Sequence, residues 1–465
     1  MPRLFVLTSA ALLALLTTAF LASPDAPQAP ANAPNILVLV ADDAGWDDFG
    51  AYGHPTIRTP HLDALAEGGW TADRAFLTTP QCSPSRVSML TGQYAHTVQA
   101  EDLHVPLAPE HRIVPSFLRE AGYFTGHLLK THYGPDAEAQ FDWYSPDLAD
   151  FSTFLDAADD QPFFMWVGFS DPHRAYGDAL NRHAPSDVRL PPTVRDTPET
   201  RADYVQYYDE IARLDTVAGS YLAELERRGL REDTYVLFLS DNGSPMPRAK
   251  GTLYDAGIKT PLLVDGPGVA DGVRYDGLVS VLDLAPTFLT WAGVPVPPEM
   301  LGEDLMSRLA DVSLPGHTYV FSERNWHNAD EHLRSVRTDA FKLIWNNYVE
   351  LPHGTAADIT GSPTWQALRA ARDAGTLTPA QARLFETPRP RVELYDLEND
   401  PHELRNLAPD PAYRDTVQAL MATLETWMTD TGDVPPHQRR RHDNIDRLTG
   451  VKFTLTNPPM YNHDD

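Results

Sequence analysis

The amino-acid sequence predicts an α/β protein whose central sheet is mostly parallel. Three apolar runs, at residues 35–40, 162–169 and 235–239, have the length and composition of strands that are buried on both faces. Between the second and third runs, tyrosine and aliphatic residues recur at helical spacing from Tyr204 to Val217. Strands that alternate with helices in this way are typical of a parallel sheet covered by helices.

Polar residues directly follow each of these predicted strands. Asp42 and Asp43 come after the first strand, residues 170–173 after the second, and Asp241 and Asn242 after the third. In open α/β sheets, ligands bind just beyond the carboxyl ends of the strands. The three polar clusters are therefore predicted to share one site.

The residue types in these clusters indicate a metal. An aspartate pair or an Asp-Asn-Gly sequence on its own usually forms a turn or a helix cap. Brought together, the clusters supply three carboxylates and an amide oxygen, from Asp42, Asp43, Asp241 and Asn242. Such hard oxygen ligands suit Ca²⁺ or Mg²⁺ and not a soft metal. We expect one divalent ion here, Ca²⁺ first, with Mg²⁺ as the alternative.

The N-terminus has the pattern of an export signal. Arg3 precedes an apolar stretch at residues 4–22, and residues 23–34 are rich in Pro and Ala. The length of the apolar stretch leaves an uncleaved membrane anchor as the alternative. No later segment approaches ~18 uninterrupted apolar residues, so we expect an exported protein, periplasmic or secreted, without stable membrane insertion.

The charge balance of the chain is strongly acidic. It has 37 Lys and Arg against 65 Asp and Glu, which gives a formal net charge of −28 at pH 7. This balance argues against nucleic acid as a partner, because phosphate contacts need clustered Lys and Arg. The charge of the whole chain does not describe a pocket, where a few local cations can reverse the field.

Cys82 is the only cysteine of the chain, so it forms no intramolecular disulfide and no thiolate metal cage. Most free cysteines are small buried hydrophobes. This one, however, opens Cys-Ser-Pro-Ser-Arg at residues 82–86, which Leu-Thr-Gly follows at residues 90–92. The combined motif resembles the signature of the type I sulfatases, in which a maturation enzyme oxidises the cysteine to formylglycine. The resemblance implies that the hydrated aldehyde at position 82 is the nucleophile.

The residues after the cysteine predict a helix that starts beside it. Residues 83–90 have the pattern of the start of a helix, with Pro84 near its first position. A helix N-terminus directs free N–H groups and a positive dipole at an anion, here the sulfate group. Arg86 lies one helical turn beyond Cys82, and within this motif we expect it to hold the hydrate.

Other segments resemble the same family. Residues 130–134 are similar to its Gly-Lys-X-His-X-Gly stretch, with Leu129 in place of the first glycine. Residues 171–174 resemble its histidine-bearing strand end, and residues 250–257 its Lys-Gly-Thr-X-Tyr-Glu-Gly-Gly. One at a time, such lysines would be solvated and such histidines ordinary hydrogen-bonding residues. The resemblance implies a catalytic set of Cys82, Arg86, Lys130, His132, His173 and Lys250, and a metal set of Asp42, Asp43, Asp241, Asn242 and the formylglycine from Cys82.

These cations match what the chemistry needs. A sulfate ester requires positive charge on its non-bridging oxygens and a proton for its leaving oxygen. We expect Lys130 and Lys250 to bind the sulfate, and His173 or Lys250 to protonate the leaving oxygen. His132 is expected to take a proton from the hydrate. The predicted substrate contacts at the rim are Arg174, Glu323 and His327.

The resemblance covers Asn35 to Leu407 and implies an alkaline-phosphatase-like α/β sandwich. We expect a signal peptide and linker at residues 1–33, a sulfatase catalytic domain at 34–330, and a smaller C-terminal α+β domain with an antiparallel sheet and a tail at 331–465. The predicted elements of the smaller domain are strands at 341–345 and 392–395, a helix at 411–429, and an insertion bordering the site at 351–390.

Within the family, residues 169–174 and 334–336 are most similar to the sulfamidase (heparan N-sulfatase) branch, which itself resembles bacterial enzymes acting on sulfated polysaccharides. The leading hypothesis is hydrolysis of sulfate esters on a sulfated carbohydrate, a polysaccharide or oligosaccharide. The alternatives are a formylglycine-dependent phosphodiesterase or phosphonate hydrolase, a sulfamidase acting on N-sulfated sugars, and a non-catalytic glycan-binding relative. The basic run at residues 439–441 is predicted to be a solvated turn, with a lid over an anionic glycan as the alternative.

Overall fold

The computed structural model of the protein describes residues 32–436, apart from residues 328 and 351. The apolar stretch of the predicted export signal and the basic run at residues 439–441 lie outside the described residues. Within the described part of the chain, no helix is both long enough and apolar enough to cross a membrane.

The central sheet confirms the predicted α/β class. In the described residues it has eight strands, in the order β10-β2-β9-β7-β1-β6-β4-β5. The three predicted strands form its middle, where β1 (Asn35–Ala41) lies parallel between β6 (Phe163–Gly168) and β7 (Thr234–Ser240). The other strands are β2 (Trp70–Ala72), β4 (Phe124–Leu129), β5 (Trp143–Ser145), β9 (Leu262–Asp265) and β10 (Val273–Tyr275). The sheet is parallel except at β9, which runs antiparallel to β2 and β7.

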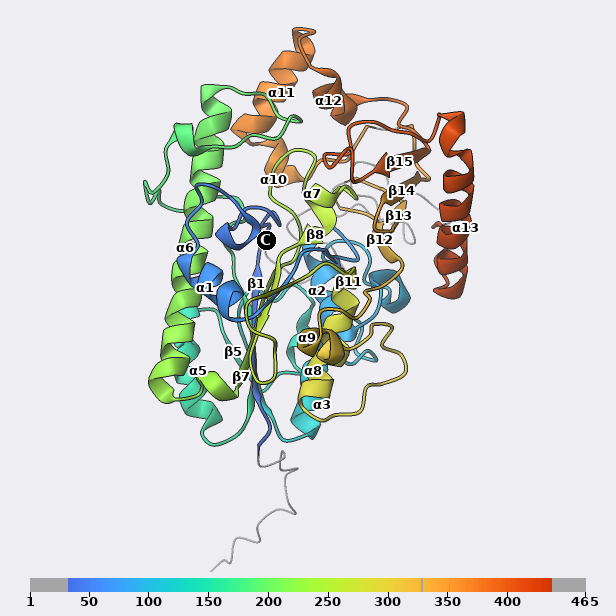
Figure 1. The fold of residues 1–465 in the computed structure, drawn as a ribbon. Helices are drawn as coiled ribbons and strands as arrows, with labels where there is room; N and C mark the ends of the chain where they lie inside the picture. The colour runs from blue at the N-terminus through green and yellow to red at the C-terminus, as the bar shows by residue number, and fades with distance from the viewer. Residues whose placement is uncertain (1–31, 328, 351, 437–465) are drawn as a thin grey trace, which may run out of the picture.

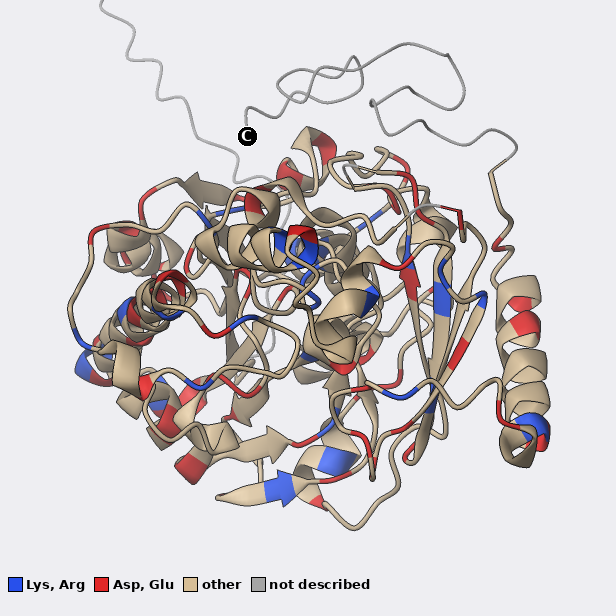
Figure 2. Ribbon diagram, turned by 90° about the horizontal axis from the view of Figure 1, so that it is seen from above, with Lys and Arg blue, Asp and Glu red and all other residues tan. Residues whose placement is uncertain are grey.

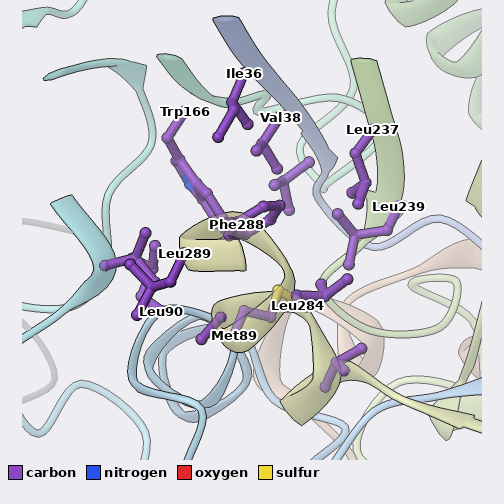
Figure 3. Close-up of a cluster of buried hydrophobic side chains, with 14 of the residues drawn as sticks. Ile36, Val38, Met89, Leu90, Trp166, Leu237, Leu239, Leu284, Phe288 and Leu289 are labelled. Carbon is purple, nitrogen blue, oxygen red and sulfur yellow. The ribbon is translucent and has the colours of Figure 1, made fainter. Parts of the chain in front are cut away.

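Helices cover both faces of this sheet (Figure 1), because alternate side chains of β1 point to opposite sides. Ile36 and Val38 belong to one apolar core, and Leu37 and Leu39 belong to the other. Figure 3 shows the first core, in which Phe288 lies against the strand side chains. The helices of the first face are α2 (Cys82–Thr91), α3 (Val114–Glu120) and α8 (Leu284–Trp291), and those of the second are α1 (Pro60–Gly68), α5 (Phe151–Ala158) and α6 (Pro198–Arg228).

Short elements complete this layer. A small three-stranded sheet consists of β3 (Ala75–Phe76), β8 (Lys259–Thr260) and β11 (Val279–Ser280). The remaining short helices here are α4 (Pro135–Glu138), α7 (Asp255–Ile258) and α9 (Met306–Ala310).

A separate antiparallel sheet lies beside the large one (Figure 1) and confirms the second half of the predicted fold class. Its strands, in spatial order, are β12 (Val320–Arg324), β13 (Leu333–Arg337), β14 (Phe341–Asn346) and β15 (Val392–Asp396). The helix α13 (Arg414–Asp430) packs on this sheet through Leu420, Leu424 and Trp427. It begins three residues later than the sequence indicated, because Pro411–Tyr413 forms a 3-10 turn. The small sheet takes in β12, ahead of residue 331, so the domain division at that residue stays a prediction.

The expected insertion at residues 351–390 is helical. It contains α10 (Ala357–Thr360), α11 (Pro363–Asp373) and α12 (Pro379–Ala382). The helix α11 packs against α6, and the segment lies at the end of the molecule toward which β1 points (Figure 1). The insertion is thereby brought to the carboxyl ends of the central strands.

Charged residues are distributed over many elements. In Figure 2, Asp and Glu are spread over the helices and loops around the sheets, and Lys and Arg lie among them. The acidic net charge of the chain is therefore not a property of one element.

Candidate active site

Two neighbouring strands bring the predicted metal ligands together. Because β1 and β7 are parallel and Ala41 pairs with Ser240, the residues that follow the two strands emerge side by side. The backbone N–H of Asp43 donates to Asp241 Oδ1 at 3.1 Å, and the backbone N–H of Asp241 donates to the carbonyl oxygen of Ala41 at 3.1 Å. Asp42, Asp43 and Asp241 are almost completely buried.

Cys82 faces this group from the start of α2. The helix begins at Cys82 itself, one residue earlier than predicted, with Gln81 as its N-cap residue. The Sγ atom of Cys82 lies 3.8 Å from Asp42 Oδ1 and 3.8 Å from Asp43 Oδ1. Burial raises the pKa of the Cys82 thiol well above its usual value. The unmodified thiol is therefore neutral here, and its Sγ atom marks where the oxygens of a formylglycine hydrate would stand.

The geometry of this cluster fits a cation. One ligand atom each from Asp42, Asp43, Cys82 and Asp241 lies within 4.8 Å of all the others. Asn242 donates through Nδ2 to Asp43 Oδ1 at 2.5 Å, while its Oδ1 atom is buried and has no hydrogen-bond partner among the described residues. A buried carbonyl oxygen without a donor is costly unless a ligand satisfies it. The three carboxylates and this oxygen suit one hard divalent ion.

Each of the three aspartates also pairs with a different cation, and these are three of the cations predicted for the site. The pairs are Lys130 Nζ with Asp42 Oδ2 at 2.6 Å, Lys250 Nζ with Asp43 Oδ2 at 2.7 Å, and Arg86 Nε with Asp241 Oδ2 at 2.8 Å. Burial acts to lower the pKa of Lys250, but Asp43 and the other nearby anions outweigh it, and the pKa lies well above its usual value. The lysine therefore stays protonated.

Arg86 is held with one donor left over. Its side chain is completely buried, and Nη1 donates to the carbonyl oxygen of Lys130 at 3.1 Å. The Nη2 atom is buried without a partner among the described residues. A buried guanidinium with one unused donor is suited to hold an anionic or hydroxyl group within the site.

Of the two predicted histidines, His173 lies at the open side of the cluster. The Nε2 atom of His173 is 3.8 Å from Asp43 Oδ2, its Nδ1 atom is hydrogen-bonded to the carbonyl oxygen of Arg174, and 29% of its side chain is exposed. The ring of His132 lies 4.8 Å from that of His104. His173 is thus accessible to a substrate while remaining next to the buried charges.

The contacts of Arg174 differ from the sequence interpretation. Its Nη1 and Nη2 atoms donate to the two carboxylate oxygens of Asp203 at 2.7 and 2.8 Å, and Nε donates to the carbonyl oxygen of Pro245 at 3.0 Å. This bidentate pair uses the donors that were expected to grip a substrate anion. The contacts indicate a structural role for Arg174 in place of a substrate contact.

Glu323 also has hydrogen-bond partners within the protein and does not lie at an open rim. It is completely buried and accepts hydrogen bonds from the backbone N–H of His96 at 3.2 Å and from Asn325 Nδ2 at 2.9 Å. The third predicted rim residue, His327, is buried as well. Burial, followed by the charge of Lys250, lowers its pKa to about 3, which keeps the imidazole neutral.

Asp358 is a site residue that the sequence did not single out. It lies on α10, in the segment expected to border the site, and its Oδ2 atom is 3.0 Å from Lys250 Nζ and 3.8 Å from His173 Nε2. Burial acts to raise the pKa of Asp358, but Lys250 and His173 outweigh it, and the pKa lies below its usual value. A lone aspartate in an Ala-rich segment carries no pattern that would have marked it.

The comparison with protein families identifies the class of protein. The sulfatase family model matches residues 34–148 and 146–294, and the model described as the C-terminal part of N-sulphoglucosamine sulphohydrolase matches residues 249–363. The chain belongs to the sulfatase family and is a sulfuric ester hydrolase. Membership of this family implies a metal ion and a formylglycine nucleophile.

Particular relatives place it within that family. The chain is 34% identical to N-sulphoglucosamine sulphohydrolase of Homo sapiens, over 86% of this chain and 90% of the relative. It is 29% identical to an ulvan-active sulfatase of Formosa agariphila, over 86% of this chain and 75% of the relative. These similarities agree with the predicted branch of sulfamidase-like and polysaccharide sulfatases.

Solved structures share the fold. One is of a protein in complex with its substrate D-glucosamine-2-N,6-O-disulfate, with a TM-score of 0.68 at 20% identity, covering 87% of this chain and 99% of that chain. Another is the phosphonate monoester hydrolase of Agrobacterium radiobacter, with a TM-score of 0.68 at 19% identity, covering 86% and 96%. The alkaline-phosphatase-like architecture is thereby confirmed.

Proposed function

We propose that this sulfuric ester hydrolase removes sulfate from a sulfated carbohydrate through a formylglycine at position 82. The observation that carries the proposal is the pairing of three buried aspartates with Arg86, Lys130 and Lys250 directly around Cys82. The sugar as the rest of the substrate is supported by the relatives, among them an N-sulphoglucosamine sulphohydrolase and an ulvan-active sulfatase.

The nucleophile would be the hydrate of a formylglycine made from Cys82 by a maturation enzyme. One hydroxyl of the hydrate would lose its proton to a neighbouring carboxylate as its oxygen bonds to sulfur. The bond from sulfur to the leaving oxygen would break, the alcohol would depart with a proton from His173 or Lys250, and a sulfate ester would remain at position 82. His132 then takes the proton of the second hydroxyl, the carbon–oxygen bond to sulfate breaks, and the aldehyde is restored. Water adds to the aldehyde to regenerate the hydrate.

Asp42, Asp43, Asp241 and Asn242 would hold one divalent ion together with position 82. Ca²⁺ is the ion we propose, with Mg²⁺ as the alternative, because the protein ligands are oxygens. When bound, such an ion polarises a sulfate oxygen and stabilises the hydrate oxygen. Among the described residues, no donor reaches the buried Oδ1 atom of Asn242, which supports this assignment.

The remaining cations would act on the sulfate group and the leaving group. Lys130 and Lys250 bind non-bridging sulfate oxygens, and both stay protonated because nearby carboxylates raise their pKa despite burial. His173, the most exposed of the group, or Lys250 delivers the proton to the leaving oxygen. Arg86 holds the hydrate through its remaining donor, Nη2.

The setting of the enzyme is proposed from the sequence. Residues 1–33 would direct export to the periplasm or beyond the cell, residues 34–330 would form the catalytic domain, and residues 331–465 the smaller domain and tail. Export would suit a substrate that is a large extracellular polysaccharide.

A panel of defined sulfated oligosaccharides tests the substrate class. We expect sulfate release from at least one sulfated sugar and from a small aryl sulfate, and much slower cleavage of an aryl phosphodiester. A faster reaction with the phosphodiester or with a phosphonate monoester would favour the second candidate function, for which a likeness in fold to a phosphonate monoester hydrolase is the only support.

A further inference from the structure

Asp358 places a negative charge where a sulfatase needs positive charge. Its carboxylate lies 3.0 Å from the ammonium of Lys250 and 3.8 Å from Nε2 of His173, and 18% of its side chain is exposed. Lys250 already has a buried counter-ion in Asp43, at 2.7 Å. A second anion beside the same lysine weakens the attraction for a sulfate group, so neutralising Lys250 does not explain it.

The position of Asp358 relative to the proposed acids indicates which part of the substrate it meets. His173 and Lys250 are the residues proposed to protonate the leaving atom, and Asp358 is close to both. The leaving atom must come within hydrogen-bonding distance of one of these acids. It therefore comes into the neighbourhood of the carboxylate of Asp358, whose Oδ2 atom is 3.0 Å from Lys250 Nζ and 3.8 Å from His173 Nε2.

A carboxylate at this place has different effects on a leaving oxygen and on a leaving nitrogen. A leaving oxygen gains negative charge as its bond to sulfur breaks, and a neighbouring carboxylate repels that charge. The nitrogen of a sulfamate carries an N–H throughout and ends as an amine that can take up a second proton. A carboxylate accepts hydrogen bonds from such a group and stabilises its positive charge.

The segment that carries Asp358 is anchored to the body of the protein by buried contacts of the neighbouring α11. Thr364, in the first turn of α11, donates from Oγ1 to Asp203 Oδ2 at 2.6 Å. Asp203 also binds the guanidinium of Arg174, the residue after His173. The chain of contacts from Arg174 through Asp203 to Thr364 ties the α10–α11 segment to the loop that carries His173.

We propose that Asp358 determines specificity for the leaving group by accepting a hydrogen bond from the N–H of an N-sulfated amino sugar. The inference rests on the proposed function and names the substrate class that the site favours. The bond between sulfur and nitrogen breaks as the hydrate oxygen bonds to sulfur, and the electron pair stays on nitrogen. A proton from His173 or Lys250 gives the free amine, which takes a second proton from water and leaves as an ammonium group beside Asp358.

The first experiment compares substrates that differ at the leaving atom. The ratio of kcat/KM for glucosamine N-sulfate to kcat/KM for glucosamine 6-sulfate is measured for the metal-loaded, matured enzyme and for Asp358→Asn. We expect this ratio of kcat/KM values to fall at least about tenfold in Asp358→Asn, because a neutral amide does not stabilise a leaving amine over a leaving alcohol as a carboxylate does. The exposed Asp373→Asn, on neighbouring α11, is the matched control and should keep the parent ratio. An unchanged ratio in Asp358→Asn would overturn the proposal.

The second experiment does not depend on turnover. Calorimetry compares the binding of glucosamine and glucose to the metal-loaded enzyme, where the parent should bind glucosamine at least about tenfold more tightly and Asp358→Asn should lose that difference. Equal affinities in the parent would overturn the role of Asp358 even in an active sulfatase. A parent enzyme that releases no sulfate from any substrate could still bind glucosamine more tightly than glucose. In that case the proposed function is wrong, and the proposed role of Asp358 in binding an amine is retained. Thermal unfolding of the variant shows that the fold is retained.

Discussion

Arg86 and Asp241 form an ion pair of 2.8 Å in which both side chains are completely excluded from solvent. The pair joins α2, the helix that begins at Cys82, to the carboxyl end of β7. Removing one partner of a buried pair leaves an uncompensated charge in the interior. The proposed nucleophile and a proposed metal ligand are therefore held together by a contact whose loss would strongly destabilise the fold.

The first prediction concerns this pair. Replacing Arg86 with Ala should lower the free energy of unfolding by about 3–5 kcal/mol and abolish most sulfatase activity. The exposed Arg112, which pairs with Glu120 at the surface, supplies the control, and Arg112→Ala should change stability by less than about 0.5 kcal/mol. Denaturant unfolding of both variants makes the comparison. Equal effects would mean that the Arg86 pair contributes no more than a surface contact.

The second prediction concerns the metal. Chelation should remove activity, and Ca²⁺ should restore it. The variant Asn242→Ala removes a buried oxygen for which the described part of the chain offers no donor, so calorimetry should find Ca²⁺ bound at least about tenfold more weakly. The exposed Asn181→Ala serves as the control. Parent-like Ca²⁺ affinity in Asn242→Ala would remove Asn242 from the ligand set.

The third prediction concerns Glu323 and pH. Burial acts to lower the pKa of His96, but Glu323 and Asp433 outweigh it and the net pKa is raised above 6.5, even though Arg334 opposes them. Burial acts to raise the pKa of Glu323, but His96 and Arg334 leave it below 4.5. The His96 contribution to stability is present below pH 6.5 and is lost as pH rises through the raised pKa. The Glu323 contribution is present above pH 4.5 and is lost as pH falls through the lowered pKa.

The pair should therefore stabilise the fold most between about pH 4.5 and 6.5. Unfolding free energy measured across pH should decline above this window in the parent. Glu323→Gln should lose stability inside the window and the share of the decline that comes from His96, while the share of His317, whose pKa Asp283 raises despite burial, should remain. Proton titration of His96 by NMR is the direct check. A Glu323→Gln protein with parent stability and weaker binding of a sulfated oligosaccharide would restore Glu323 as a substrate contact.

The fourth prediction concerns Arg174. Because its donors hold Asp203, we expect Arg174→Ala to lower activity on a small aryl sulfate and on a charged oligosaccharide by similar factors. Arg174→Lys should not rescue, since an ammonium cannot form the same two parallel hydrogen bonds. A double-mutant cycle with Asp203→Asn should show strong coupling in stability. A loss confined to the oligosaccharide would instead return Arg174 to the substrate rim.

Much of the site was predictable because its residues follow strands that the sequence marks clearly. The runs that became β1 and β7 are uninterrupted and apolar, so the meeting of Asp42, Asp43 and Asp241 followed from the geometry of parallel strands. The start of α2 was predicted to within one residue, because helix ends are set by backbone capping that sequence patterns locate only approximately.

The partners of charged residues were less predictable. Arg174 next to His173 suggested a substrate contact, but Asp203 lies on α6, 29 residues further along the chain, and only the packing of that helix brings it close. Asp358 reaches the site on a four-residue helix that has no periodic pattern. Contacts between distant segments of this kind depend on tertiary packing, which the secondary-structure propensities of the local sequence do not predict.

The most direct test of the central claim is the mass of the peptide that contains position 82, measured alongside specific activity. Preparations that differ in maturation should contain different fractions of formylglycine at position 82. Activity on an aryl sulfate should rise in proportion to that fraction and extrapolate to zero where no formylglycine is present. Cys82→Ala should lie at that zero point. Full activity in protein that carries only unmodified Cys82, or in Cys82→Ala, would contradict the account.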